Sequence, residues 1–391
     1  MTKKKIGLMG LSFISGNKGC VALAYSFLEV LHSLSSMRDE QYELFIFTNS
    51  MSHKMLPKVR YNSLRYHLTP IKFPKPIRFM ENRMIQNCDV IFDFTAGDSF
   101  TDIYGLDRFN DRTALKEKVI NLNVPLILGS QTYGPFSSEQ AEMRAAEVLK
   151  KATAIFSRDE LSSSIVFDLS GRDVIETTDI AFMLPYHKDR KAHQMKKIGI
   201  NPSGLLWSGG YTQNNQFSLS VNYREYITSL VKELVELGDW EIHLIQHVFT
   251  QNPNIVDNDA IPCRELKKQF PSVIVAPVYE LPMDIKSYIA SMDLFIGSRM
   301  HATIAAFSSG TAVIPFSYSR KFEGLYKQFK YEYIISGREL TTEAALKTTL
   351  DWVTQYMTLK EKVRDCSEQI DQLNKRLISE TSKCLDNIWD K

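Results

Sequence analysis

Arg299 and His301 lie two positions apart, shortly after an apolar run. Together they could bind an anion and transfer a proton to it. The run Leu294–Gly297 predicts a strand, and Ser298 predicts the N-cap of a helix over Met300–Ser308. At a helix start, unpaired backbone N–H groups and the helix dipole favour negative charge. An arginine fork holds phosphate oxygens, and a histidine moves protons near neutral pH. The segment therefore predicts a phosphate or carboxylate site in which a proton is transferred.

More side chains that can bind or titrate follow other predicted strands in this half of the chain. They are Asn201, His247, Tyr318, Arg320 and Lys321, with Asn258 and Asp259 in a polar loop. Because the carboxyl ends of parallel strands share one sheet edge, these groups are expected near Arg299 and His301. The alternative is structural: the two residues then cap the sheet or pair with carboxylates.

Polar residues follow strands in the first half of the chain as well. Asp98 and Ser99 come after the predicted strand Val90–Phe94, and Gln131 comes after Pro125–Leu128. Carboxylates and hydroxyls at a strand end suit hydrogen bonds to sugar hydroxyls, and plain loop capping is the alternative. The glycine loop at residues 16–19 allows close backbone approach but lacks the spacing of a dinucleotide fingerprint.

The elements that must position these residues are short apolar strands that alternate with helical stretches. That order predicts parallel sheets built from βαβ units, in two α/β halves. The polar segment Pro185–Lys196 is the expected boundary, so we predict domains at 1–190 and 191–340 and C-terminal helices at 341–391. An apolar seam runs through these helices at Leu359, Val363, Cys366, Ile370, Leu373 and Leu377. It predicts a helix packed on the domains, with a dimerising coiled coil as the alternative.

Length and composition exclude several classes of protein. The 391 residues suit two domains, and 47 basic against 45 acidic residues leave a net charge of +2, which does not suggest nucleic-acid binding. The five cysteines form no paired motif, so we expect neither a disulfide framework nor a metal site. We expect a cytoplasmic location for the same reason. No apolar run is long enough to predict a transmembrane helix.

With these residues in view, the chain resembles the polysaccharide pyruvyl transferase family. The matching stretches, in family order, are residues 16–20, 95–100, 129–135, 157–159, 178–182, 246–248, 297–302 and 318–325. The most specific is the Gly-x-Arg-x-His element at residues 297–301. The resemblance implies a GT-B-like fold with two Rossmann-like domains, parallel sheets and a C-terminal helical segment. It also implies transfer of a pyruvyl group from phosphoenolpyruvate to two hydroxyls of a sugar, as a cyclic ketal on a cell-surface polysaccharide or its precursor.

The resemblance also assigns roles to residues. His301 and Arg299 would be catalytic, and the donor would be bound by Arg299, Lys321, Ser298, His247, Asn201 and Tyr318. The sugar acceptor would be bound in the N-terminal half by Asn17, Asp98, Ser99 and Gln131. No metal and no cofactor besides the donor substrate phosphoenolpyruvate is implied. The chain departs from the family pattern at two places. It has Cys20-Val21 where the family usually has an acidic residue, and Thr95-Ala96-Gly97 where the family has three glycines.

Partners and alternatives complete the expectations. The acceptor sugar is either free or lipid-linked, which leaves open a peripheral contact at the inner face of the membrane. A homo-oligomer through the C-terminal helices is open as well. The alternative functions are a GT-B glycosyltransferase that uses a nucleotide sugar, and a catalytically silent member that binds sugar.

Overall fold

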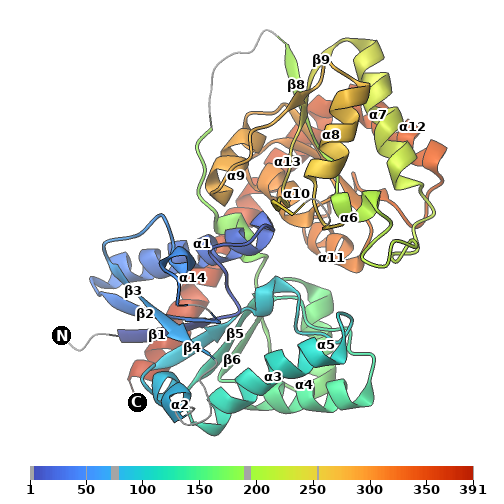
Figure 1. Ribbon diagram of the computed structural model, residues 1–391. Coiled ribbons are helices and arrows are strands. Elements are labelled where there is room, and N and C mark those ends of the chain that lie inside the picture. The colour runs from blue at the N-terminus through green and yellow to red at the C-terminus, as the bar shows by residue number, and fades with distance from the viewer. Residues whose placement is uncertain (1–3, 50, 72–78, 189–194, 253–254, 391) are drawn as a thin grey trace. The chain divides into compact units, whose positions relative to one another are not determined.

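The computed structural model describes residues 4–49, 51–71, 79–188, 195–252 and 255–390, and these form two compact units (Figure 1). The first unit comprises Met1–Ser15, Leu23–Met183 and Asp371–Lys391. The second comprises Gly16–Ala22 and Leu184–Ile370. The predicted ranges 1–190, 191–340 and 341–391 therefore differ from these units at residues 16–22, at 184–190 and in the C-terminal helices. Of the predicted boundary segment, residues 189–194 lie outside the described residues.

The first unit contains a parallel sheet of seven strands in the order β3-β2-β1-β4-β5-β6-β7. The strands are β1 (Lys4–Met9), β2 (Tyr42–Thr48), β3 (Leu64–Pro70), β4 (Val90–Asp93), β5 (Leu126–Gln131), β6 (Ala154–Ser157) and β7 (Ile175–Glu176). The helices that lie wholly or mostly in this unit are α1 (Lys18–Arg38), α2 (Phe79–Gln86), α3 (Leu106–Asn121), α4 (Glu139–Lys151), α5 (Glu160–Ser170) and α14 (Ser367–Trp389).

The second unit contains a parallel sheet of six strands in the order β10-β9-β8-β11-β12-β13. The strands are β8 (Lys196–Asn201), β9 (Trp240–Leu244), β10 (Ile274–Val275), β11 (Leu294–Gly297), β12 (Ala312–Ser317) and β13 (Ile335–Ser336). The helices are α6 (Gly204–Trp207), α7 (Tyr223–Leu237), α8 (Ala260–Gln269), α9 (Pro282–Ala290), α10 (Met300–Ser308), α11 (Arg320–Gln328), α12 (Thr342–Thr354) and α13 (Tyr356–Asp365).

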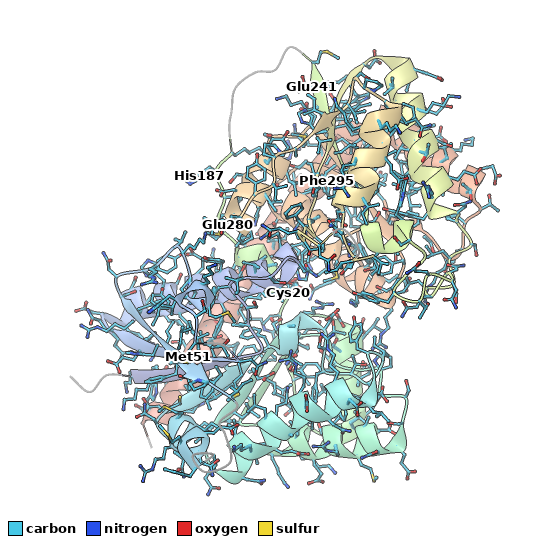
Figure 2. The ribbon with its side chains drawn as sticks, in the orientation of Figure 1. Cys20, Met51, His187, Glu241, Glu280 and Phe295 are labelled. Atoms are coloured by element: carbon cyan, nitrogen blue, oxygen red, sulfur yellow. The ribbon has the colours of Figure 1, made fainter. Side chains whose placement is uncertain are left out.

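The sequence pattern explains these layers. Every residue of β4, β11 and β12 is buried, as expected for strands covered by helices on both faces, and Phe295 in β11 is labelled in Figure 2. The helix α7 instead buries one stripe, at Tyr223, Tyr226, Ile227, Leu230, Val231 and Leu234, with spacings of three, one, three, one and three. Asn222 caps its start, and Gly238, with a φ of 68°, ends it in the left-handed region. In Figure 1, α12 lies alongside α7.

Both sheets place their strand-order reversal next to the first strand. In the first unit β1 lies between β2 and β4, and in the second unit β8 lies between β9 and β11. At such a reversal, the connections that follow two neighbouring strands run to opposite sides of the sheet, and this opens a crevice beyond the carboxyl ends of the strands. Each unit therefore has one preferred place for a ligand within its own sheet.

The sequence predicts the parallel sheets correctly but misses two edge strands, β3 and β13. The C-terminal seam lies on two helices, α13 and α14, and its Leu359, Val363 and Leu377 are at most 3% exposed. These side chains are thus packed within the chain. The helix α14 also contacts the first unit through Arg38 and Asp386, 2.7 Å apart, and through the rings of Tyr42 and Trp389.

One helix among the described residues, α1, is long and apolar enough by length and composition to cross a membrane. Of its most apolar window, 67% is buried inside the structure. Core helices and N-terminal signal sequences pass the same test, so this finding carries no membrane assignment.

Candidate functional site

The helix α10 begins beyond the carboxyl end of β11, at the strand-order reversal of the second sheet. Its N-cap is Arg299, which makes no side-chain capping bond, so the predicted N-cap role of Ser298 is wrong. Ser298 is buried, and its hydroxyl accepts a hydrogen bond from the Tyr223 hydroxyl at 2.7 Å. Tyr223 comes from α7, 75 residues away, and this contact leaves no geometry for capping. The start of α10 thus has no side-chain cap, and the positive end of the helix dipole there suits an anion.

A fully buried carboxylate, Asp259, holds the predicted site together. Its Oδ2 accepts the backbone N–H groups of His247 and Val248 at 3.0 and 2.9 Å, and its Oδ1 accepts that of Gly204 at 2.9 Å. The Asn201 amide donates to Oδ2 at 3.2 Å, and its own oxygen accepts the Arg299 N–H at 3.0 Å. One side chain therefore fixes the loops that follow β8, β9 and β11.

The Arg299 guanidinium is paired with two carboxylates. Its Nη2 lies 2.6 Å from Asp259 Oδ1 and 2.5 Å from Asp257 Oδ1, and its Nε lies 3.1 Å from Asp259 Oδ1. Burial alone would lower the pKa of Arg299, but the two carboxylates raise it above its ordinary value. The side chain is 7% exposed, and Nη1 makes no bond to the described residues. The expected pairing with carboxylates is thus realised at Nε and Nη2, and Nη1 is the atom left to meet a ligand.

His247 is a neutral imidazole in this setting. It lies three residues beyond β9, whose last residue is Leu244. The ring is 4% exposed, and burial lowers its pKa to about 3. That value also includes the charges of His301, Arg299 and Lys18, which lower the pKa, and that of Asp259, which raises it. The charged side chains are therefore close enough to His247 to change its pKa by electrostatic interaction. His247 can form hydrogen bonds as a neutral ring.

The glycine loop after β1 belongs to this same unit. The Lys18 N–H donates to the His247 carbonyl at 3.0 Å, and the Phe249 N–H donates to the Gly16 carbonyl at 3.0 Å. A Cβ built on Gly19 would lie 2.4 Å from Nδ1 of His301, so glycine is required for this approach. The structure thus places Asn17, predicted on the acceptor side, with the predicted donor-site residues, and its side chain accepts the Gly19 N–H at 2.9 Å.

The strand next to β11 brings further groups to the same edge. The neighbouring pair Gly297 and Pro315 sets β12 beside β11, so that Tyr318 and Lys321 follow close to the end of β11. Tyr318 is half-buried, and its ring packs against Phe217 at 4.9 Å between centroids. Lys321 lies in the first turn of α11 and is half-buried.

The remaining predicted residues lie in the first unit, beyond β4 and β5. Asp98 is half-buried and accepts the Tyr104 hydroxyl at 3.0 Å. Ser99 is 1% exposed and accepts a bond from Arg108 at 2.8 Å. Gln131 is fully buried, and its amide donates to the Asp93 carbonyl at 3.2 Å. Asp98 is therefore the most accessible of the three, and their acceptor roles stay predictions.

The turn between β4 and Asp98 has an unusual backbone. Thr95, Ala96 and Gly97 have φ values of 43°, 55° and 87°, all in the left-handed region. Glycine alone adopts this region without strain, which explains why the family's pattern has glycines here. This chain keeps the conformation with two side chains in place, and such strain is concentrated at functional loops.

The structure therefore gathers Asn17, Asn201, His247, Ser298, Arg299, His301, Tyr318 and Lys321 in the second unit, and Asp98, Ser99 and Gln131 in the first. Sequence reasoning missed Asp257, Tyr223 and Lys18, and it treated Asp259 only as a loop residue. A buried acidic residue just before a helix could have been noticed, but its partners come from three other segments, which follow β8, β9 and β11. Within the described ranges, no group of three or more His, Cys, Asp or Glu side chains is placed to hold a metal ion. The second-unit cluster can bind a small anion and move a proton.

Comparison with known proteins agrees with this arrangement. A family model described as polysaccharide pyruvyl transferase matches residues 17–320. A UDP-N-acetylglucosamine 2-epimerase structure is similar, with 10% identity, a TM-score of 0.59 and coverage of 100% of this chain and 98% of that chain. So is UDP-GlcNAc 2-epimerase from Neisseria meningitidis bound to UDP-GlcNAc, with 12% identity, a TM-score of 0.54 and coverage of 95% and 99%.

A third similar structure is Anabaena HepE in complex with UDP-glucose, with 10% identity, a TM-score of 0.56 and coverage of 97% and 99%. At these identities the structures establish the fold, which is the two-domain α/β GT-B fold. The family match extends over most of the chain and includes Arg299, His301 and the glycine loop. The chain therefore belongs to the polysaccharide pyruvyl transferase family and is a transferase enzyme.

Proposed function

We propose that the enzyme transfers a pyruvyl group from phosphoenolpyruvate to two hydroxyls of a sugar and forms a cyclic ketal. The observation that supports this most is the cluster at the start of α10, where Arg299, His301 and His247 meet the uncapped helix end. Phosphoenolpyruvate carries a phosphate and a carboxylate on three carbons, so it needs several donors within a small volume. Arg299 Nη1 and Lys321 would supply them, and the dipole of α10 would favour the negative charge.

His301 would act as the general acid. It would donate a proton to the methylene carbon of phosphoenolpyruvate, and a sugar hydroxyl would attack the neighbouring carbon and release its own proton. A second hydroxyl of the same sugar would then displace phosphate and close the ketal, with its proton leaving on the phosphate.

The neutral state of His247 fits this scheme. A second imidazolium beside His301 would compete for the same negative charge, whereas a neutral ring can orient the substrate or His301 by hydrogen bonds. Asp259 holds His247 and Arg299 in place through the backbone and the guanidinium respectively.

The direct test is to incubate the protein with phosphoenolpyruvate and a panel of free, activated and lipid-linked sugars. Phosphate release together with the sugar's gain of a pyruvate ketal by mass is the expected result. UDP-glucose serves as the comparison ligand, because a similar structure was solved with it. Binding of UDP-glucose with no binding of phosphoenolpyruvate would instead favour a glycosyltransferase, and sugar binding with no turnover would favour a silent member.

Two variants separate the roles. His301→Ala is expected to abolish turnover and to leave phosphoenolpyruvate binding mostly intact. Arg299→Lys keeps a cation beside the buried carboxylates but removes the planar fork, so it is expected to weaken phosphoenolpyruvate binding. Calorimetry and phosphate release measure both effects. Undiminished turnover of His301→Ala would remove this histidine from the reaction.

A further inference from the structure

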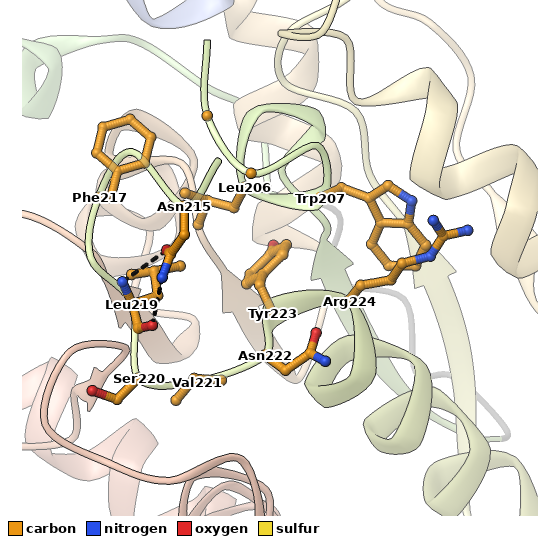
Figure 3. Close-up of a pocket in the computed structure, with 12 residues that line it drawn as sticks. Leu206, Trp207, Asn215, Phe217, Leu219, Ser220, Val221, Asn222, Tyr223 and Arg224 are labelled. Carbon is orange, nitrogen blue, oxygen red and sulfur yellow. Dashed lines mark hydrogen bonds between the residues drawn. The ribbon is translucent and has the colours of Figure 1, made fainter. Parts of the chain in front are cut away.

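A cavity of about 370 Å³ lies in the second unit, between α6, the start of α7 and the loop that joins them (Figure 3). Its volume falls in the usual range of small-molecule sites. Three aromatic rings and three polar side chains make up half of its twelve lining residues: Trp207, Phe217, Tyr223, Asn215, Asn222 and Arg224. Two of these contact residues of the second-unit cluster: Tyr223 through Ser298, and Phe217 through the ring of Tyr318.

Trp207 is the largest side chain of this wall, and it is 8% exposed. The Arg224 guanidinium lies 5.0 Å from the ring centroid and stacks over Trp207. The ring is thereby held in one orientation.

The charge of the lining points to a neutral ligand. Arg224 is the sole cation among the lining residues, all of which are described, and it is bonded to Glu265 outside the cavity. A phosphate or diphosphate would require additional cations or free helix N–H groups. The start of α7 does not supply them freely, because the Asn222 side chain accepts the Glu225 N–H at 3.3 Å. Aromatic faces beside amide and hydroxyl groups suit the apolar faces and hydroxyl edges of a sugar ring.

The loop that closes the cavity is held in an unusual conformation. Gly209 and Gly210 have φ values of 79° and 92°, and Gln213, Asn215 and Ser218 are left-handed without being glycine. The Asn215 amide bonds both backbone groups of Leu219 at 2.9 Å, as the dashed lines in Figure 3 show. Left-handed backbone at residues other than glycine is strained, and such strain is often found where the wall of a binding site is preformed.

Tyr223 connects this cavity to the anion cluster. Its ring forms part of the cavity wall, while its hydroxyl donates to Ser298 at 2.7 Å and accepts the Ser203 N–H at 2.8 Å. A ligand in the cavity thus lies against the side chain that supports the start of α10.

From these observations we infer that this cavity is a saccharide-binding site, which holds a neutral sugar unit of the acceptor against Trp207. The inference rests on the proposed function for its choice of acceptor, and it adds a sugar contact in the second unit to those predicted in the first.

The test measures sugar binding directly, without turnover. Methyl glycosides of glucose, galactose, mannose and their 2-acetamido forms are titrated into the full chain at millimolar concentrations, with ligand-observed NMR and tryptophan fluorescence as readouts. At least one is expected to bind. Trp207→Leu removes the aromatic face, so it should weaken that binding about tenfold and leave phosphoenolpyruvate binding unchanged. Trp240→Leu, at another buried tryptophan of the same unit, is the matched control and should leave the sugar affinity unchanged.

Three outcomes would overturn the inference. They are no binding by any glycoside, equal weakening by Trp207→Leu and Trp240→Leu, and an unchanged sugar affinity in Trp207→Leu. Thermal unfolding of both variants shows whether the fold is kept, and Arg224→Gln, whose side chain is largely exposed, provides a second probe of the same wall. Failure of the proposed function would appear separately, as absent phosphoenolpyruvate binding or phosphate release while the glycoside still binds.

Discussion

Asp259 is the residue on which most of the cluster's geometry depends. It collects three backbone N–H groups, one amide and one guanidinium, and none of it is exposed. Asp259→Asn keeps the shape but removes the charge that balances Arg299. We expect the free energy of unfolding to fall by about 3 kcal/mol, at the lower end for a broken buried pair because Asp257 remains. Chemical denaturation measures this.

Asp257→Asn is the matched control for that change. Asp257 also pairs with Arg299, but its side chain is 18% exposed and accepts no backbone N–H in the contacts described above. The expected loss is smaller, about 1 kcal/mol. A greater loss for Asp257→Asn than for Asp259→Asn would contradict the central role of Asp259.

Gly19 governs the space beside His301. A Cβ at this position would lie 2.4 Å from Nδ1 of the imidazole, so Gly19→Ala must displace the ring. We expect turnover to fall roughly a hundredfold, as for other small misplacements of a reacting group. Stability should change little, since alanine favours the helix by about 1 kcal/mol and offsets part of the clash. Phosphate release and thermal unfolding separate the two effects.

Cys20→Ala, one residue further along α1, controls for the Gly19 experiment because it adds no atom. It should leave turnover within a few-fold of the parent. Unchanged turnover in Gly19→Ala would mean that His301 tolerates displacement, and the role proposed for its position would be lost.

At the scale of elements, the left-handed turn after β4 makes a clear prediction. Ala96, with a φ of 55°, bears a strain of about 1–2 kcal/mol that glycine would not. Glycine also makes the unfolded chain more flexible, at about 0.5–1 kcal/mol. Ala96→Gly should therefore raise the free energy of unfolding by about 0.5–1 kcal/mol, measured by denaturation.

Gly97→Ala provides the opposite case in the same turn. Its φ is 87°, and a Cβ would lie 2.6 Å from Cδ1 of Leu23, so we expect a loss above about 1 kcal/mol. Destabilisation by Ala96→Gly would show that this turn is not strained by its side chains.

Burial decides which elements could be predicted from the sequence. Strands such as β11 are apolar throughout and are easily recognised. The edge strand β3 contains exposed polar residues such as Arg65 and His67, and β13 has only two residues, so neither was recognised. The N-cap at Ser298 was mispredicted because a tyrosine distant in sequence takes its hydroxyl. Strand ends could thus be located from local pattern, but partners supplied by tertiary contacts, such as those of Asp259, could not.

At the scale of the whole molecule, the buried His247 couples stability to pH. Its folded pKa of about 3 lies below the unfolded value of about 6.5, so the unfolded chain binds one more proton between these values. The stabilisation is present above pH 6.5 and is lost as the pH falls towards 3, by up to about 1.4 kcal/mol per pH unit. Denaturation of the parent and of His247→Gln between pH 4 and 6 should show a shallower slope in the variant.

His53→Gln, at an exposed histidine, controls for the removal of an imidazole and should keep the slope of the parent. Equal slopes in the parent and in His247→Gln would show that His247 is not held neutral by the fold.

Each of the two units is built from segments that are separated in the sequence by residues of the other unit. The first is completed by Asp371–Lys391, and the second contains Gly16–Ala22, which is translated before nearly all of the first. A nascent chain on the ribosome can therefore assemble the second unit only by keeping its early segment available. The helix α14, whose Trp389 packs against Tyr42 of β2, follows nearly all of the second unit along the chain. Splitting the gene at the boundary between the halves would thus yield two fragments, each lacking a part held by the other.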